Sequence, residues 1–300
     1  MRAKPADAAE RERQHLCAKL LALLPEEGRV ETAIDGLALT RYDGPSPATN
    51  CFYRPMLALV AQGFKHSQIG AEECSYGAGR CVVVGVDMPG VFHIGAASRE
   101  APFLSLSLTL NRYTVAKLLE EMPPGGHTAG EAKPVVTAPA GPELLAACGR
   151  LLDLLSAPEK IAVLAPLVVK EIHFHLLTGP QGDCLRLFCS RGTQTANIAE
   201  AIGRLRGSYA KPLNMEDLAG QVGMSRSSFN RHFRRITGLS PLQFQKRLRL
   251  YEAERLMLFE GHNAGAAAQA VGYESASQFT RKYKRLFGQP PRRDVAGKRT

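Results

Sequence analysis

The strongest constraint on the fold is a residue pattern that occurs twice in the last third of the chain. In its first copy, an apolar helical stripe begins at Met215 and ends before Gly223, a residue that tolerates a positive φ after a helix. Ser225 then suits the N-cap of a second helix, whose apolar stripe consists of Phe229, Phe233 and Ile236. Two short helices joined by a tight turn with glycine are typical of a helix-turn-helix unit.

The same arrangement returns further along the chain. Gly272 follows Gly223 by 49 residues, and a second stripe consists of Phe279, Tyr283 and Leu286. Between the two copies, Ser240 is a candidate cap and Pro241 begins a long helix that is predicted to end near Phe259. We therefore expect two helix-turn-helix units on either side of a connecting helix. Residues 215–238 are called the first unit and residues 264–288 the second unit.

The positive charge of the chain lies in this region. The 300 residues contain 38 Lys and Arg against 28 Asp and Glu, a net charge of +10. Residues 203–300 hold 19 of the basic and 7 of the acidic residues, so they carry +12, whereas residues 1–202 carry −2. Such a basic module usually binds a polyanion, most often nucleic acid. The basic residues of a single helix would more simply be a solvent-exposed surface. Two units with matched caps, turns and cores instead favour a role in DNA binding.

Several motifs in this region resemble the AraC/XylS transcriptional regulators. They are LAGQVGMS in the first unit, GLSP and RLRLYEAERLM in the connecting segment, and VGYESASQF and FGQPP in and after the second unit. The resemblance covers about residues 205–293 and implies a seven-helix DNA-binding unit whose two recognition helices enter successive major grooves on one face of the DNA. Because such grooves recur about every 34–36 Å, a rigid connecting helix is needed to set the spacing.

The resemblance also implies which side chains contact the DNA. In the first unit the exposed positions hold Ser227, Asn230, Arg231 and Arg234, and in the second they hold Ser277, Gln278, Thr280, Arg281 and Lys284. Arg can pair with guanine through two hydrogen bonds, and Asn or Gln with adenine, whereas Ser discriminates little. The chain departs from the family at Ala264 and Ala267, where isoleucine is usual, so we expect the second unit to bury less apolar surface.

The first two thirds of the chain have a different pattern. Leucines at helical spacing predict a helix over residues 6–24. Short apolar runs follow, which favour a compact antiparallel barrel or sandwich; they lie at 30–34, 37–42, 56–61, 81–86 and 103–108. Helical spacing returns at 115–122, 143–155, 159–177 and 191–208. The predicted fold class is α+β, with a β-barrel and helical connector over residues 1–190 and an all-α double helix-turn-helix over 191–300.

Two segments of this part are similar to the cupin-like N-terminal domain of one AraC subgroup. They are RPMLALVAQGFKH (54–66) and SYGAGRCVVVGVDMPGVFHI (75–94), within a similarity that spans about residues 28–185. The resemblance implies a domain that senses an effector or dimerises. Candidate effector contacts are Arg54, His66 and His93. The expected partners are promoter DNA, RNA polymerase, a small-molecule effector and a second copy of the chain, with activation as the expected outcome.

Two other functions remain open at this stage. A cupin-type enzyme would need closely spaced metal ligands on strands, but His66 and His93 are isolated, and His173 and His175 lie in a helical segment where they point about 200° apart. We therefore expect no enzyme, no metal and no cofactor. A redox or electrophile sensor would need a reactive thiol, for which Cys51 beside Arg54 is the candidate. The simpler interpretation is that the cysteines are small apolar side chains that pack in the core.

Cysteine usage and hydropathy indicate the compartment. The seven cysteines are odd in number and include no C-x-x-C pair, which argues against a disulfide framework or structural zinc. No apolar run reaches the roughly 18–20 residues of a membrane span, and the N-terminal residues lack an apolar core typical of a signal peptide. We therefore expect no membrane partner and a location in the cytoplasm.

Overall fold

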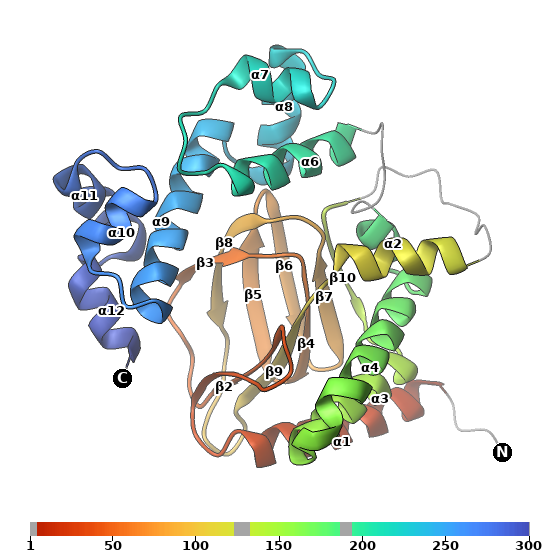
Figure 1. Cartoon of the computed structure of the whole chain (residues 1–300). Helices are drawn as coiled ribbons and strands as arrows, with labels where there is room; N and C mark the ends of the chain where they lie inside the picture. The colour runs from red at the N-terminus through yellow and green to blue at the C-terminus, as the bar shows by residue number, and fades with distance from the viewer. Residues whose placement is uncertain (1–4, 123–132, 187–193, 300) are drawn as a thin grey trace.

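The computed structural model of the chain describes residues 5–122, 133–186 and 194–299. Within them a β domain with packed helices precedes a helical domain (Figure 1), which confirms the α+β class predicted from the sequence. The predicted domain boundary at residues 190 and 191, and Cys189, lie outside the described residues.

Two antiparallel sheets form the β domain. The first sheet has the order β1-β2-β9-β4-β7-β10, with β1 (Gly28–Glu31), β2 (Leu37–Tyr42), β9 (Phe103–Thr109), β4 (Met56–Gln62), β7 (Arg80–Val84) and β10 (Val135–Pro139). The second sheet has the order β3-β8-β5-β6, with β3 (Thr49–Tyr53), β8 (Met88–Ile94), β5 (Phe64–Ile69) and β6 (Glu72–Gly77). The five strands β1, β2, β4, β7 and β9 were predicted; the other five are more polar or contain Pro and Gly, and were missed.

Helices cover the first sheet. The N-terminal helices are α1 (Pro5–Leu23), α2 (Arg112–Glu121), α3 (Pro142–Asp153), the short 3-10 helix η1 (Leu154–Ser156), α4 (Pro158–Thr178) and α5 (Gly182–Arg186). Leu57 and Leu59 of β4 and Leu106 of β9 are buried in one core with residues of α1, α3 and α4. Figure 1 shows these three helices at the opposite end of the molecule from the C-terminal helices. The predicted helices at 6–24, 143–155 and 159–177 are therefore present.

A second core lies between the two sheets and continues into the C-terminal domain. Val60, Val82 and Tyr76 belong to the same buried cluster as Phe229 and Phe233 of the first unit. Because these buried residues form one contiguous cluster, the β domain and the first unit share one core.

Helix α4 corrects one sequence expectation. Its length and composition are those of a helix that could cross a membrane, and 28% of its most apolar 18-residue segment is buried. A core helix of a globular domain meets the same criterion, and Ile172, Leu176 and Leu177 of α4 are buried in the core against the first sheet. Val163 and Leu167, by contrast, are 67% and 61% exposed. The helix therefore has one face in the core and one apolar face uncovered.

Seven helices form the described part of the C-terminal domain. They are α6 (Gln194–Gly207), α7 (Met215–Gln221), α8 (Arg226–Thr237), α9 (Pro241–Phe259), α10 (Ala264–Ala270), α11 (Ala276–Phe287) and α12 (Pro291–Arg299). Helices α7 and α8 make the first unit, α10 and α11 the second, and α9 connects them, as the sequence predicts (Figure 1).

Candidate nucleic-acid interface

The first unit has the geometry that its sequence predicts. Gly223 has a φ of +67° and turns the chain between α7 and α8. The Ser225 hydroxyl accepts a hydrogen bond from the Ser228 amide at 3.4 Å, and Gly238 ends α8 in the left-handed conformation. Phe229 and Phe233 are fully buried. The apolar face of α8 is therefore fixed in the core, and its polar face is left for a partner.

The second unit repeats this geometry with a tighter turn. Gly272 has a φ of +83°, Ser275 caps α11 through the Gln278 amide at 3.3 Å, and Gly288 ends α11 in the left-handed conformation. A Cβ atom on Gly272 would lie 2.1 Å from the carbonyl oxygen of Ala210. Only glycine fits this turn, because a side chain would meet backbone as well as an unfavourable φ.

The alanine-rich helix α10 packs against the connecting helix α9. Ala267 is fully buried, and Leu256 and Leu258 of α9 belong to the same apolar cluster, while Phe259 is 74% exposed. Gly265 lies in the first turn of α10 rather than in its middle. A surface groove of about 920 Å³ lies between α9, the segment 210–213 and the second unit, lined by residues that include Leu242, Arg249, Gly265 and Tyr273.

Helix α9 ties the two units together. Ser240 and Gln243 form a reciprocal capping box at its start. Arg249, in its middle, donates hydrogen bonds to the carbonyl oxygens of Tyr209 at 2.7 Å, Gly272 at 2.9 Å and Lys211 at 3.0 Å. One guanidinium thus joins the segment after α6, the connecting helix and the turn of the second unit, which restricts rotation of the second unit about α9.

The residues expected to contact DNA lie mainly on open surface. Ser227, Arg231 and Arg234 of α8 are exposed, and so are five from α11, namely Ser277, Gln278, Thr280, Arg281 and Lys284. Asn230 is half-buried, and its side-chain amide donates to the Arg226 carbonyl at 3.0 Å. Its side chain must release that hydrogen bond to pair with a base.

The electrostatics of this face favour an anion. Among the described residues, Arg231, Arg234 and Arg281 form no ion pair with a carboxylate. Desolvation and the neighbouring charges of Lys246, Arg281 and Arg249 lower the pKa of Lys282 below its ordinary value. Cations held close together without carboxylates produce the positive potential that phosphates neutralise.

The N-terminal domain contacts the end of each recognition helix. The turn at Gly70, between β5 and β6, lies against the end of α8, since a Cβ on Gly70 would be 2.8 Å from the Ile236 carbonyl oxygen. The Asn50 side chain of β3 donates a hydrogen bond of 2.7 Å to the Leu286 carbonyl oxygen near the end of α11. The same β domain therefore fixes both recognition helices at their C-terminal ends.

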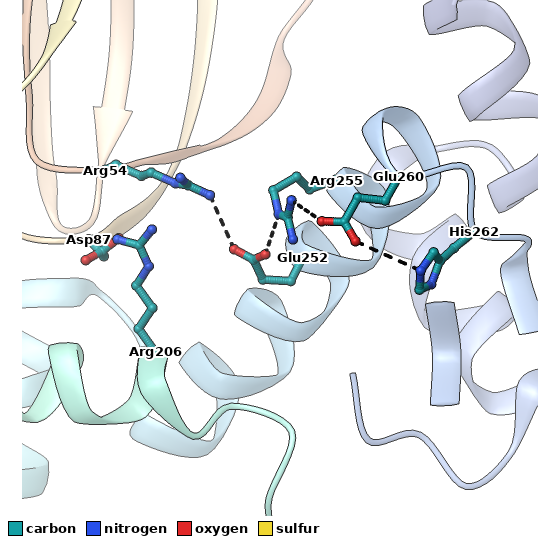
Figure 2. A network of polar contacts seen from close by, with 7 residues as sticks. All are labelled: Arg54, Asp87, Arg206, Glu252, Arg255, Glu260 and His262. Carbon is teal, nitrogen blue, oxygen red and sulfur yellow. Dashed lines mark hydrogen bonds and ion pairs between the residues drawn. The ribbon is translucent and has the colours of Figure 1, made fainter. Parts of the chain in front are cut away.

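Aromatic and charged side chains complete this contact. Phe52 of β3 lies 5.8 Å from the ring of Phe244 and 5.4 Å from that of Tyr251, both on α9. Figure 2 shows an ion-pair network on the same side of the domain contact, in which Arg54 meets Glu252 at 3.5 Å. The network continues from Glu252 through Arg255 and Glu260 to His262, and a separate pair joins Arg206 to Asp87 at 2.8 Å.

The structure separates the three residues predicted to contact an effector. Arg54 lies at the domain contact, where its partner is Glu252. His66 and His93 stack on the second sheet with ring centroids 4.5 Å apart, and His66 also meets the Ser75 hydroxyl at 2.8 Å. The two histidines are together, whereas Arg54 belongs to another surface. Their role toward an effector stays a prediction.

The cysteines and the remaining histidines have structural environments. Burial raises the pKa of Cys51 to about 11, and the cations that oppose this effect are Lys65 and Arg29, so Arg54 does not give the thiol thiolate character. His173 is fully buried; one ring nitrogen accepts from the Asn111 amide at 3.0 Å and the other donates to the Val169 carbonyl at 2.7 Å. No group of three or more potential metal ligands occurs among the described residues.

Comparison with known proteins decides the family. A family model described as "AraC-type transcriptional regulator N-terminus" matches residues 33–184, and a helix-turn-helix domain model matches residues 218–295. The chain belongs to the AraC family of transcriptional regulators. This confirms the resemblance predicted from the sequence for both parts of the chain. AraC membership also explains why two unlike modules, one β-rich and one basic, occur together.

Curated AraC-type relatives match over part of their length. The transcriptional activator RhaS of Pectobacterium carotovorum is 25% identical over 136 residues, which are 45% of this chain and 47% of RhaS. The transcriptional regulator ExsA of Pseudomonas aeruginosa is 28% identical over 168 residues, 56% of this chain and 60% of ExsA. The chain thus spans about half the length of these relatives.

A solved structure shares the whole fold. ToxT of Vibrio cholerae, bound to an unsaturated fatty acid, superposes with a TM-score of 0.60 at 12% identity, covering 89% of this chain and 97% of ToxT. This similarity establishes the two-domain AraC-type fold.

Sequence reasoning missed the residues of the domain contact. Asn50 and Phe52 lie in a strand that was not predicted, and Asp87 lies in a turn. Glu252 and Arg206 lie on predicted helices, where they could not be told from solvated charges. One available signal was Phe52, an aromatic residue that follows the polar residues Thr49 and Asn50 closely.

Proposed function

We propose that this AraC-type protein is a sequence-specific DNA-binding transcriptional regulator, and an activator, rather than an enzyme. The observation that carries the proposal is the pair of recognition helices, α8 and α11, with fixed apolar faces and exposed faces that hold Arg231 and Arg281. Phosphate contacts by the surrounding cations would position the protein, and Arg and Gln side chains would read base edges. Residues 191–300 would form the DNA-binding domain, acting in the cytoplasm on promoter DNA and RNA polymerase.

We assign the control of DNA binding to residues 1–190 and a small-molecule effector. The domain contact supports this assignment, because Asn50 and the Gly70 turn touch the ends of both recognition helices. A ligand that shifts β3 or this turn would change the placement of the two helices on DNA. ToxT, which has the same fold, is bound to an unsaturated fatty acid, which supports a ligand role for this type of fold.

A homodimer through α4 is part of the same proposal. Val163, Leu167 and Phe174 recur at helical spacing on one face of α4 and are 67%, 61% and 41% exposed. An exposed apolar stripe of this kind is typical of a protein interface. A second copy offers the same stripe, so α4 would pair with its counterpart about a two-fold axis. Two protomers would then present four recognition helices to adjacent half-sites.

Nuclease protection of promoter DNA tests the regulatory function. DNA fragments selected for binding to the full chain should show discrete protected regions that scrambled fragments lack. The matched variant Arg231→Ala should lose this discrimination, whereas Arg11→Ala, an exposed change on α1 far from the two units, should keep it. Protection that is equal on selected and scrambled DNA would contradict sequence-specific binding.

A further inference from the structure

The groove of about 920 Å³ beside α9 is continuous with the surface expected to read DNA. Its lining includes Leu242 and Gln245 near the start of α9 and Ala276, the first residue of α11. Ala276 directly precedes Ser277 and Gln278, two of the residues expected to contact DNA. We call this hollow the central groove. It borders the second recognition helix and the helix that leads on from the first.

Small residues form much of the lining of the central groove. Gly265, Ala268 and Gly272 line it together with Ala276. Gly265 is exposed, and a Cβ atom there would meet only the Asn263 side-chain oxygen, at 3.4 Å. A partner can approach the main chain closely at such a surface, because no long side chains cover it.

Two lysines lie beside the central groove without carboxylate partners. Lys246 follows Gln245 on α9 and is exposed, and Lys282 follows Arg281 on α11 and is half-buried. The Lys282 Nζ atom lies 5.7 Å from the ring centroid of Tyr273, which lines the groove. Neither lysine forms an ion pair within the part of the chain that the structure describes. Their charges are therefore available to an anion from outside.

The charges that act on Lys282 are all positive. Burial has the largest effect on its pKa, and together with the charges of Lys246, Arg281 and Arg249 it lowers that pKa. Arg249 already donates to backbone carbonyl groups, so it contributes a fixed charge rather than a free donor. The carboxylate of Glu274 also lines the groove. An anion placed between the two lysines would relieve the repulsion among these cations.

We propose that the central groove holds the sugar–phosphate backbone of the DNA between the two major grooves, with Lys246 and Lys282 on its phosphates. This site deepens the proposed DNA binding and rests on it. Recognition helices in successive major grooves leave a minor groove between them, and the strands that border it carry the phosphates nearest to a surface between the two units. The positive charge and the continuity with α11 favour this occupant over a protein partner.

The base pairs between the two major grooves would then be read by their shape. A·T-rich steps narrow the minor groove and strengthen the negative potential that attracts cations. Lys246 and Lys282 come from different helices whose relative position is fixed, so the phosphates that they contact must lie at a defined separation. Affinity would therefore depend on base pairs whose edges no side chain contacts.

The salt dependence of DNA affinity measures these contacts. Lys246→Met and Lys282→Met keep the length of the side chain and remove its charge. Each should reduce the slope of the logarithm of affinity against that of salt concentration by about 0.9, and each should weaken binding about tenfold at fixed salt. Lys117→Met, on the exposed surface of α2, should change neither quantity. An unchanged slope in either groove variant would overturn the site.

Neutral methylphosphonate groups locate the contact on the DNA. Phosphates of a selected site are replaced one at a time in each strand. With the parent chain, replacement at one or more positions between the two major-groove patches should weaken binding about tenfold. The same replacement should have little further effect on Lys246→Met or on Lys282→Met. Equal losses for the parent chain and both variants at every position would overturn the proposal.

Two DNA sites with the same major-groove sequences test the reading of shape. One has an A·T-rich spacer and the other a G·C-rich spacer of equal length. The parent chain should bind the A·T-rich site at least about fivefold more tightly, and the chain with both lysines replaced should lose most of that preference. Equal affinity of the parent chain for the two sites, or a preference that survives both substitutions, would contradict shape reading.

Glu274→Gln tests the sign of the charge that the groove accepts. Because it removes a carboxylate from the lining, it should tighten binding to every DNA sequence by about two- to fivefold. Unchanged or weaker binding would count against a phosphate backbone in the groove.

The outcomes separate this site from the proposed function. Sequence-specific nuclease protection by the parent chain, together with unchanged salt slopes in the variants, would overturn the central groove and uphold the regulator. Loss of saturable DNA binding by the parent chain would contradict the regulator itself. Lys246 is exposed, so Lys246→Met should keep the thermal midpoint of the parent chain, and its slope decides alone if Lys282→Met melts at a lower temperature.

Discussion

Alanine at the two turn glycines should affect the two helix-turn-helix units very differently. Gly223 and Gly272 both have positive φ, so alanine at either position costs about 1–2 kcal/mol of left-handed backbone strain. At Gly223 a Cβ atom meets nothing within 4 Å, so the strain is the whole effect. At Gly272 the Cβ would lie 2.1 Å from the Ala210 carbonyl oxygen, which is backbone and cannot rotate away.

The additional cost at Gly272 follows from its neighbours. Relief of the overlap adds about 1–3 kcal/mol of overpacking, and it displaces the carbonyls of Ala210 and Gly272, which accept hydrogen bonds from Arg249 at 3.1 and 2.9 Å. Hydrogen bonds to a charged group contribute about 1.5–3 kcal/mol. With one of these hydrogen bonds lost, we therefore expect Gly272→Ala to lower the free energy of local opening of the second unit by at least about 3.5 kcal/mol.

Amide hydrogen exchange measures this difference directly. In Gly272→Ala, exchange in the second unit should accelerate by on the order of 100-fold or more, and exchange in the first unit should change little. In Gly223→Ala, the first unit should accelerate by about 5- to 30-fold. Equal acceleration in the two variants would refute the argument that the Ala210 carbonyl, rather than the φ angle alone, requires glycine at 272.

Three further predictions concern DNA and assembly. Arg231→Ala should cost about 1–3 kcal/mol on selected DNA and little on scrambled DNA, whereas Lys284→Ala should weaken both equally; competition titrations that show equal losses for Arg231→Ala would reject its base-reading role. The logarithm of DNA affinity should fall linearly with that of the salt concentration, by about 0.9 per neutralised phosphate, and a flat response would exclude backbone contacts. Leu167→Glu should convert dimers to monomers in sedimentation experiments while Phe259→Glu does not, and unchanged dimerisation of Leu167→Glu would exclude α4.

The C-terminal domain could be predicted almost completely from the sequence because its signals are local. Gly223 and Gly272 mark turns, Ser225, Ser240 and Ser275 act as the caps, and the apolar stripes recur at helical spacing. Each of these features depends on residues within a few positions of each other.

The second sheet could not be predicted, because its strands do not form apolar runs. Strand β5 alternates an interior face that contains Lys65 and Ser67 with an outer face that contains His66 and Gln68. Such alternation is weak when a cation and a hydroxyl occupy the interior positions. Lys65 becomes an interior residue only once the register of β5 is known.

The contact between the domains also depends on tertiary structure. Asn50 and Leu286 are joined by a hydrogen bond although 236 positions separate them, and Arg54 meets Glu252 across 198 positions. No local pattern encodes such pairs, and an isolated surface charge gives no indication of its partner. The exposure of the residues expected to face DNA was easier to predict, because the amphipathic period of α8 and α11 separates buried from exposed positions.

Hydroxyl-radical footprinting of the full chain on a selected DNA site tests the central claim most directly. If α8 and α11 of one protomer occupy successive major grooves, protection should appear as two patches separated by about 10–10.5 base pairs on one face of the DNA. Arg281→Ala should weaken the patch of the second unit and leave that of the first. A single patch per protomer, or two patches on opposite faces of the DNA, would contradict the placement of both units in the major groove.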